Sequence, residues 1–174
     1  MKILIVCTGN ICRSPAAEYL LREAIPAASG STSGTVTVTS AGTAGMSGYP
    51  MDSRSLKYLS DHGVDGSGFT ARRVNRRVLQ DVDLVIGLEK THVDHCLRLA
   101  PALLKRTFRL HQIAEWHRSG DLTSLTQLPH LRHQLPRILH DHRDPVGFTS
   151  TEEYTALLDA IADDIRALAT LVTH

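Results

Sequence analysis

The sequence predicts an α/β fold built around a mostly parallel sheet. Three observations carry this prediction. A short apolar run at the N-terminus leads through a glycine-containing turn into an amphipathic helix. Further β-rich runs alternate with helical segments, and the C-terminal stretch is a long amphipathic helix. Strands that alternate with helices favour parallel pairing through right-handed crossovers.

The expected elements follow from hydrophobic periodicity and from helix start and stop signals. The first strand is an almost unbroken apolar run, which is typical of a strand buried on both faces. Ser150 and Glu153 form a capping box, and apolar residues then follow at three- and four-residue steps. Strands are expected at 2–6, 35–42, 83–89 and 107–110. Helices are expected from Ser14 up to Pro26, at 52–62, at 91–99 and over 150–172.

The composition indicates a single domain over residues 1–174. Hydrophobic residues make up 42% of the chain and charged residues 21%, and the net charge is +1. Such a charge gives no general attraction to nucleic acid or to a membrane surface. The chain shows no targeting signal and only three cysteines, so we expect a cytoplasmic protein whose thiols are reduced.

The stretch "VCTGNICRSP" at 6–15 lies between the first strand and the first helix. Ligands of open α/β sheets bind at such a place, and the backbone N–H groups of the turn and the helix N-terminus attract anions. Gly9 allows close approach of the backbone, and Asn10 tolerates a left-handed conformation. Arg13 can bind two phosphate oxygens at once. The stretch therefore predicts a phosphate-binding loop.

Cys7 stands at the base of this loop, where the same groups would stabilise its thiolate for attack on phosphorus. Ser14 could donate a hydrogen bond to the sulfur. The alternative is a structural cysteine in an ordinary glycine turn. An acid is also needed to protonate the departing oxygen, and Asp144 is the best candidate because Pro145 and Gly147 mark a loop that could hold it over the pocket.

Several motifs together resemble the low-molecular-weight protein tyrosine phosphatases. They are "VCTGNICRSPAAE", "SAGT", "GYPMDSRS", "TARR", "DLVIGLEKTH" and "DPVG…EEY", in that order. The resemblance runs from Lys2 to about His111 and resumes at Arg143. Residues 115–142 have no counterpart, so an atypical segment is expected before the acid loop, with room for an added helix beside the pocket.

The resemblance implies a four-stranded parallel sheet in a three-layer α/β/α arrangement. It also implies metal-free, cofactor-free hydrolysis of phosphotyrosine in proteins through a cysteinyl-phosphate. Cys7 would be the nucleophile, Arg13 the phosphate-binding arginine, and Asp144 the general acid and then the base. Cys12 would protect an oxidised nucleophile as a reversible disulfide. The phosphate-binding loop would comprise Thr8, Gly9, Asn10, Ile11, Cys12, Arg13 and Ser14.

Three positions depart from the pattern of this family. Phe69 stands where many members carry a histidine that ties the loop together, so Asn10 and Ser14 must be supported differently. Val146 and Met46 stand at or near positions where aromatic residues are common. The pocket walls should therefore differ from those of most members.

Other functions remain open for a loop of this kind. Phosphoarginine phosphatases share it but typically carry threonine at the position of Ile11, which favours an aryl phosphate here. Thioredoxin-linked arsenate reductases need a downstream cysteine pair, and only Cys96 is present. A silent phosphate-binding module is the remaining alternative. The expected partner is a tyrosine-phosphorylated protein, with a kinase as a further candidate. We expect no binding to nucleic acid or to a membrane, and we expect a monomer.

Three other clusters are expected to be solvated surface. A helical trio that could bind zinc lacks an obvious fourth ligand. A run of arginines is expected to be a basic face near an anionic substrate, and histidines around the acid loop are expected to be solvated. These clusters are His92, His95 and Cys96; Arg72, Arg73, Arg76 and Arg77; and His130, His133, His140 and His142.

Overall fold

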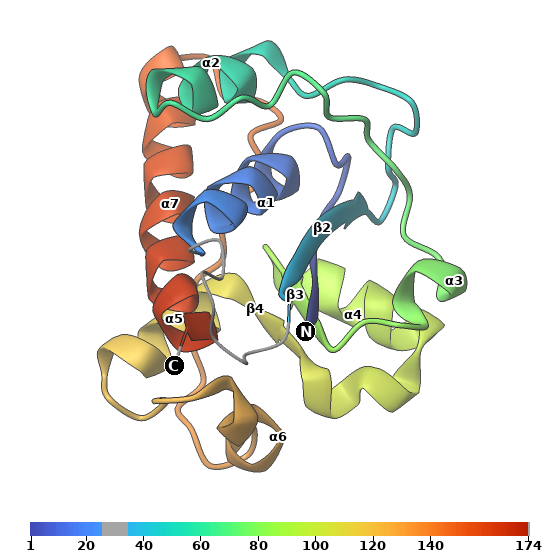
Figure 1. Cartoon of the computed structure of the whole chain (residues 1–174), viewed down its shortest axis with the longest axis vertical. Helices are drawn as coiled ribbons and strands as arrows, with labels where there is room; N and C mark the ends of the chain where they lie inside the picture. Colours follow the sequence, from blue (N-terminus) through green and yellow to red (C-terminus); the bar gives the residue numbers. More distant parts are fainter. Residues whose placement is uncertain (26–34, 174) are drawn as a thin grey trace.

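The computed structural model describes residues 1–25 and 35–173. Four strands form one parallel sheet in the order β2-β1-β3-β4, and helices lie on both of its faces (Figure 1). The strands are β1 (Lys2–Cys7), β2 (Thr37–Gly42), β3 (Leu84–Gly87) and β4 (Thr107–Arg109). The expected three-layer α/β/α fold with a four-stranded parallel sheet is confirmed.

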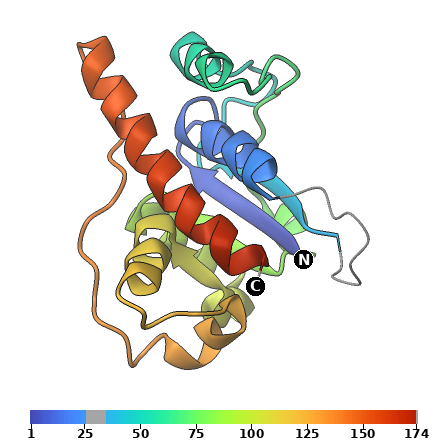
Figure 2. The ribbon, with the colours of Figure 1, turned by 60° about the vertical axis from the view of Figure 1, so that its left-hand side comes forward.

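Helix α7 packs against both α1 and α5 on one face of the sheet, and Figure 2 shows α1 and α7 side by side near β1. Helix α4 packs on the other face, against β1, β3 and β4. The helices are α1 (Arg13–Ala24), α2 (Ser53–Asp61), α3 (Arg76–Leu79), α4 (Lys90–Leu99), α5 (Leu110–Arg118), α6 (Leu128–Leu131) and α7 (Thr151–Thr173). Two 3-10 turns are η1 (Pro101–Arg106) and η2 (Leu125–Gln127). The expected end of the first helix at Pro26 lies outside the described residues.

The side chains of β1 alternate between the two faces of the sheet. Ile3, Ile5 and Cys7 belong to the apolar cluster shared with α1, α5 and α7, whereas Leu4 and Val6 belong to the cluster beneath α4. All five are buried, so the predicted strand with two buried faces is confirmed. Because alternation has a period of two, the last residue of the strand, Cys7, comes out on the side of α1.

Helix α7 follows the predicted apolar stripe. Its side chains at Tyr154, Leu158, Ile161, Ile165 and Leu168 are buried against α1 and α5.

Among the described residues, we find no helix that is both long enough and apolar enough to cross a membrane.

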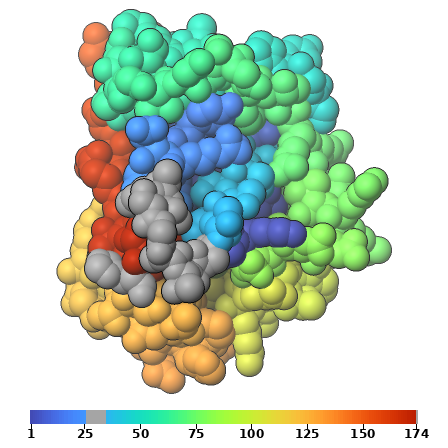
Figure 3. All heavy atoms as spheres, viewed as in Figure 1, coloured from blue at the N-terminus to red at the C-terminus, as the bar shows by residue number. Residues whose placement is uncertain are grey.

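The atypical segment 115–142 is largely irregular. Helix α5 supplies its first residues, η2 and α6 follow, and an extended stretch then leads toward Asp144. In Figure 3 this segment, coloured gold to orange, forms the lower end of the visible face. The indole nitrogen of Trp116, a side chain buried in the core, donates to the carbonyl of Pro136 at 3.0 Å. The segment is thereby fastened to α5 before it reaches the acid loop.

Candidate active site

The loop between β1 and α1 lies at the carboxyl end of the central strand of the sheet. The sulfur of Cys7, which is 2% exposed, has two polar neighbours. The backbone N–H of Asn10 points at it from 3.3 Å, and the hydroxyl oxygen of Ser14 lies 2.9 Å away. The structure thus places the predicted nucleophile among groups that stabilise a thiolate.

Asn10 holds the loop in shape. Its φ of +57° is the left-handed conformation that asparagine tolerates, and its side chain is fully buried. The amide nitrogen donates to the hydroxyls of Ser14 at 2.9 Å and of Ser40 at 2.8 Å. The amide oxygen accepts from the backbone N–H of Arg72 at 2.8 Å. The left-handed turn is therefore fixed by three hydrogen bonds, to α1, to β2 and to the loop that contains Arg72.

The direction of these hydrogen bonds can be deduced. Ser40 donates its single proton to a carboxyl oxygen of Glu18 at 2.5 Å, because its other partner, the amide nitrogen of Asn10, can only donate. Ser40 therefore accepts from Asn10, and Asn10 uses its other amide proton on Ser14. The hydroxyl proton of Ser14 is left for the sulfur of Cys7. Burial raises the pKa of Glu18, and its ion pair with Arg22 opposes that shift.

Arg13 is the buried centre of the site, only 1% exposed. One of its terminal nitrogens pairs with Glu89 and donates to the backbone carbonyl of His142 at 2.7 Å. The other pairs with Asp144 at 2.5 Å and lies 3.4 Å from the hydroxyl of Thr8. The structure therefore brings the loop arginine together with the predicted general acid from the other end of the chain.

Asp144 lies in a tight turn above the loop. Its second carboxylate oxygen accepts from the backbone N–H of Val146 at 3.0 Å, and Phe148 N–H donates to the carbonyl of Pro145 at 3.0 Å. Gly147 takes a φ of +96°, which an L side chain rarely adopts. The Asp-Pro-x-Gly pattern thus forms the kind of loop that the sequence predicted.

The chain just before this turn is anchored to the ends of the strands. Asp141 accepts from the backbone N–H of Lys90, the first residue of α4, at 3.0 Å and pairs with Arg109 at 2.7 Å. The backbone N–H of His142 donates to the carbonyl of Leu88 at 3.1 Å. The atypical segment therefore ends in a fixed position, and it carries Asp144 over the loop.

Comparison with known proteins shows the family of the chain. A family model described as low molecular weight phosphotyrosine protein phosphatase matches residues 2–174. The chain belongs to this family. Among curated relatives, the low molecular weight protein-tyrosine-phosphatase Ptp of Acinetobacter johnsonii is 37% identical over 108 residues, which are 62% of this chain and 70% of the relative. The corresponding Etp of Escherichia coli K12 is 34% identical over 113 residues, 65% of this chain and 71% of the relative.

Solved structures of this phosphatase family superpose on almost the whole chain. One, described as a protein tyrosine phosphatase, has a TM-score of 0.71 at 26% identity and covers 96% of this chain and 92% of its own. The YwlE arginine phosphatase from Geobacillus stearothermophilus has a TM-score of 0.73 at 26% identity, with 97% and 90% covered. The same fold therefore occurs in relatives that are named for two different phosphorylated residues.

Phe69, one of the departures from the family pattern named above, contributes apolar packing beside the loop. The ring is buried in an apolar cluster with Met51 and Leu59 and lies edge-on to the ring of Tyr19, with centroids 6.2 Å apart. It offers no hydrogen bond to the loop. The polar support comes instead from the hydrogen bond that Asn10 donates to Ser40 and from the one that its amide oxygen accepts from the backbone N–H of Arg72.

His92 is a second supporting residue, and its tautomer follows from its partners. Its Nδ1 accepts from the backbone N–H of Glu89 at 3.0 Å, so its Nε2 carries the proton and donates to Thr8 at 3.0 Å. Burial, helped by the nearby Arg13, lowers the pKa of His92 to about 4. The expectation that His92 and Cys96 lie on a helix surface is wrong, because both side chains are buried.

Replacing His92 by glutamine is expected to remove part of the acid sensitivity of folding. The unfolded chain takes up a proton at this ring below about pH 6.5, whereas the folded protein does so only near pH 4. Between these values the unfolded state binds more protons, so the free energy of unfolding falls as the pH falls, by about 3 kcal/mol in total. Urea unfolding at several pH values measures this loss. If the free energy of unfolding fell equally in the wild type, in His92→Gln and in the exposed control His133→Gln, the lowered pKa of His92 would be contradicted.

The other two cysteines differ in their position relative to Cys7. Cys12 lies in the loop itself, partly buried, and burial raises its pKa to about 11. Cys96 belongs to the cluster beneath α4, on the opposite face of the sheet, and burial raises its pKa to about 12. Since the sheet separates Cys96 from Cys7, a relay of electrons between them, as arsenate reduction would need, has no direct path.

Few side chains flank the loop between β1 and α1 on the side of Met46 and Tyr49. The backbone N–H of Met46 donates to the carbonyl of Gly9 at 2.9 Å, and that of Tyr49 donates to Met46 at 3.0 Å. The side chains of Met46 and Tyr49 are exposed, as is that of Val146 on the acid loop. Tyr49 therefore supplies an aromatic ring on the stretch that runs beside the loop, and the departures at Met46 and Val146 leave open, apolar surroundings.

Proposed function

We propose that this phosphatase hydrolyses phosphotyrosine in proteins, with Cys7 as nucleophile, Arg13 as phosphate ligand and Asp144 as general acid and base. The observation that carries the proposal is the directed chain of hydrogen bonds that ends on the sulfur of Cys7. A hydroxyl proton from Ser14 and a backbone N–H both point at that sulfur. Such donors favour the thiolate, which is the reactive form.

In the first step the thiolate of Cys7 attacks phosphorus in line with the phenolic oxygen. The sulfur–phosphorus bond forms, the phosphorus–oxygen bond breaks, and Asp144 gives its proton to the departing tyrosine oxygen. The phosphate oxygens are held by the N–H groups of residues 8–14 and by Arg13. Phosphate entering the loop exchanges with Asp144 on the guanidinium, which leaves the carboxyl close to the departing oxygen.

In the second step Asp144 takes a proton from a water molecule, whose oxygen attacks phosphorus. The sulfur–phosphorus bond breaks, inorganic phosphate forms, and the sulfur leaves as the thiolate. Ser14 stabilises this leaving thiolate through the same hydrogen bond that it makes before the reaction. Both steps balance without a metal or an organic cofactor.

Phosphotyrosine is favoured over phosphoarginine by Ile11. Its partly buried side chain packs against the apolar cluster of Met51 and Phe69, and it offers no hydroxyl toward a guanidino phosphate. The curated relatives named above are described as tyrosine phosphatases, while one structural neighbour is described as an arginine phosphatase. The two substrates therefore need a direct comparison.

The deciding experiment measures phosphate release from a phosphotyrosine peptide and from phosphoarginine side by side. We expect kcat/KM to be higher for the peptide by at least about tenfold, which corresponds to roughly 1.4 kcal/mol of differential binding in the transition state. An Ile11→Thr variant should narrow this preference. A wild type that prefers phosphoarginine would overturn the substrate assignment, and failure to hydrolyse either would overturn the proposed activity.

The proposed role of Cys12 is protective. Oxidation of Cys7 to a sulfenic acid would be followed by attack of the Cys12 thiol, which forms a disulfide and releases water. We also propose that the protein works in the cytoplasm, where such a disulfide is reduced again.

The proposed partner is a tyrosine-phosphorylated protein, with a kinase as a further candidate. The exposed side chains of Arg72 and Arg73, next to the loop support, suit an acidic phosphopeptide.

A further inference from the structure

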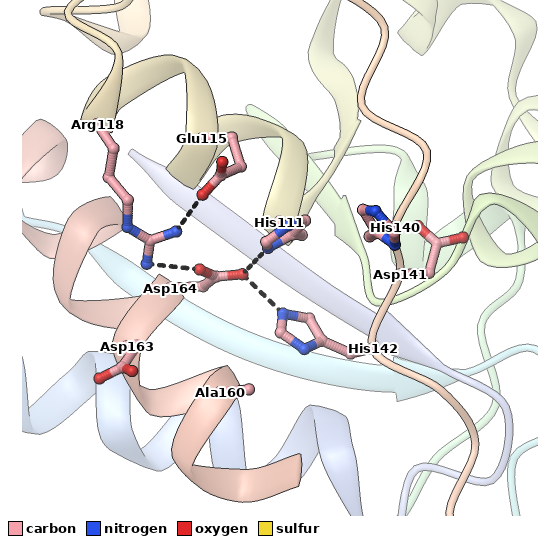
Figure 4. Close-up of a pocket in the computed structure, with 9 residues that line it drawn as sticks. All are labelled: His111, Glu115, Arg118, His140, Asp141, His142, Ala160, Asp163 and Asp164. Atoms are coloured by element: carbon pink, nitrogen blue, oxygen red, sulfur yellow. Dashed lines mark hydrogen bonds and ion pairs between the residues drawn. The ribbon is translucent and has the colours of Figure 1, made fainter. Parts of the chain in front are cut away.

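Three side chains from distant parts of the sequence meet beside the acid loop. His111 lies on α5, Asp164 on α7, and His142 on the stretch that leads to Asp144 (Figure 4). One carboxylate oxygen of Asp164 lies 2.9 Å from Nδ1 of His111 and 2.8 Å from Nε2 of His142. His142 is 6% exposed and Asp164 2%. The expectation that His142 is a solvated histidine is therefore wrong.

The three groups line a cavity of about 660 Å³. The lining is acidic, because four carboxylates face it against one guanidinium, a formal balance of −3 with neutral histidines. The guanidinium is that of Arg118, which pairs with Glu115 and with Asp164. The carboxylates are Glu115, Asp141, Asp163 and Asp164, of which Asp141 is also the partner of Arg109 and Asp163 the partner of Arg166. The electrostatic character of the cavity suits a cation.

We propose that His111, His142 and Asp164 form a binding site for Zn²⁺ or a similar first-row divalent ion. Their nearest ligand atoms, two imidazole nitrogens and a carboxylate oxygen, all lie within 4.8 Å of one another. Imidazole nitrogen suits zinc, copper and nickel, whereas magnesium and calcium prefer an all-oxygen shell. Two histidines and one carboxylate, with a fourth position open to the cavity, are a known zinc-binding arrangement.

The side chains have to shift to hold the ion. Bonds of about 2.0–2.1 Å to tetrahedral Zn²⁺ put neighbouring ligand atoms about 3.3 Å apart. Each nitrogen would therefore move about 0.5 Å from the carboxylate oxygen, and the two nitrogens, now within 4.8 Å of each other, would approach by up to about 1.5 Å through rotation of the two rings. Arg118 donates to the other oxygen of Asp164 at 2.7 Å, which orients the carboxylate and leaves its first oxygen for the ion. The cavity provides the path of entry.

The site is linked to the proposed catalytic machinery through the backbone of His142. Its carbonyl accepts from Arg13 at 2.7 Å, its N–H donates to Leu88 at 3.1 Å, and it precedes Asp144 by two residues. An ion bound to the ring would tie this stretch to α5 and α7 at once. The site would therefore stabilise the position of the acid loop, separately from the phosphate-binding loop.

The test measures Zn²⁺ binding by calorimetry in a Cys7→Ser protein, so that the thiolate of the loop cannot compete and no turnover is involved. We expect one ion per chain and a rise in the unfolding temperature with Zn²⁺ concentration. In the same background, His111→Gln should weaken binding at least tenfold. The matched control is His133→Gln, an exposed histidine of the segment 115–142, and it should leave the affinity unchanged.

Two spectroscopic measurements make the result independent of how the variants fold. Co²⁺ bound in place of Zn²⁺ should show visible bands without the charge-transfer absorption of a thiolate ligand, which excludes Cys12. Nitrogen NMR should show the ring signals of Nδ1 of His111 and Nε2 of His142 shifting on addition of Zn²⁺. Absence of binding, thiolate absorption, or unshifted histidine signals would overturn the proposal. None of these outcomes depends on whether the protein hydrolyses phosphotyrosine.

Discussion

The Asp144→Asn variant is expected to lower kcat for a phosphotyrosine peptide by about 10²–10⁴, which is the usual contribution of a general acid. Asparagine keeps the size of the side chain and can still accept from the N–H of Val146, so the turn should persist. The loss arises because the departing tyrosine oxygen is no longer protonated. Steady-state kinetics on the peptide measures it.

A substrate with a better leaving group sharpens this test. An activated aryl phosphate such as 4-nitrophenyl phosphate needs less help from an acid, so Asp144→Asn should reduce its turnover much less than that of the peptide. Asp61→Asn, on the exposed face of α2, is the matched control and should behave like the wild type. Equal losses for both substrates would contradict a role of Asp144 as the proton donor.

The Cys7→Ser variant is expected to release no phosphate above background, a loss on the order of 10⁶-fold, as is typical when a nucleophile is removed. A serine hydroxyl at the base of the loop has no base beside it and is not ionised by the hydrogen bonds that stabilise a thiolate. Binding of the phosphopeptide should survive, since the other loop groups remain. Single-turnover assays and calorimetry separate the two properties.

Cys12→Ser is the matched control for Cys7→Ser, since the two cysteines share one loop. Its turnover should stay within a few-fold of the wild type. After brief treatment with hydrogen peroxide and then a thiol reductant, the wild type should regain activity, whereas Cys12→Ser should not, because its sulfenic acid oxidises further. Normal recovery of activity in Cys12→Ser would contradict the protective role of Cys12. Residual turnover by Cys7→Ser would contradict the assignment of Cys7 as the nucleophile.

The shape of the loop between β1 and α1 could be predicted from the sequence because its geometry is local. Eight consecutive residues, from Cys7 to Ser14, contain the strand end, the left-handed asparagine and the helix start. The turn that carries Asp144 could be predicted for the same reason, since proline and glycine specify it, whereas phosphate binding and the role of Asp144 as the acid stay predictions. The fold class followed from alternation of strands and helices, which is likewise visible within short windows.

The supporting residues could not be predicted because their contacts depend on how distant elements dock. Glu89 lies two residues beyond β3, and only the parallel pairing of β1 with β3 brings it to Arg13. His142 and Asp164 meet because the irregular segment crosses to α7. Helical spacing alone did not reveal that His92 faces the interior, which is why a surface was expected there.

Among the described residues, the guanidinium of Arg13 donates to Glu89, Thr8, Asp144 and the carbonyl of His142. Under the proposed mechanism, a phosphate ester would exchange places with the carboxylate of Asp144. Part of the attraction between Arg13 and the phosphate would be offset by the loss of the ion pair between Arg13 and Asp144. In the proposed cycle, the return of Asp144 to the arginine would compensate for the loss of inorganic phosphate in the same way. The ion pair of Arg13 with Asp144 would then favour release of the product over tight retention.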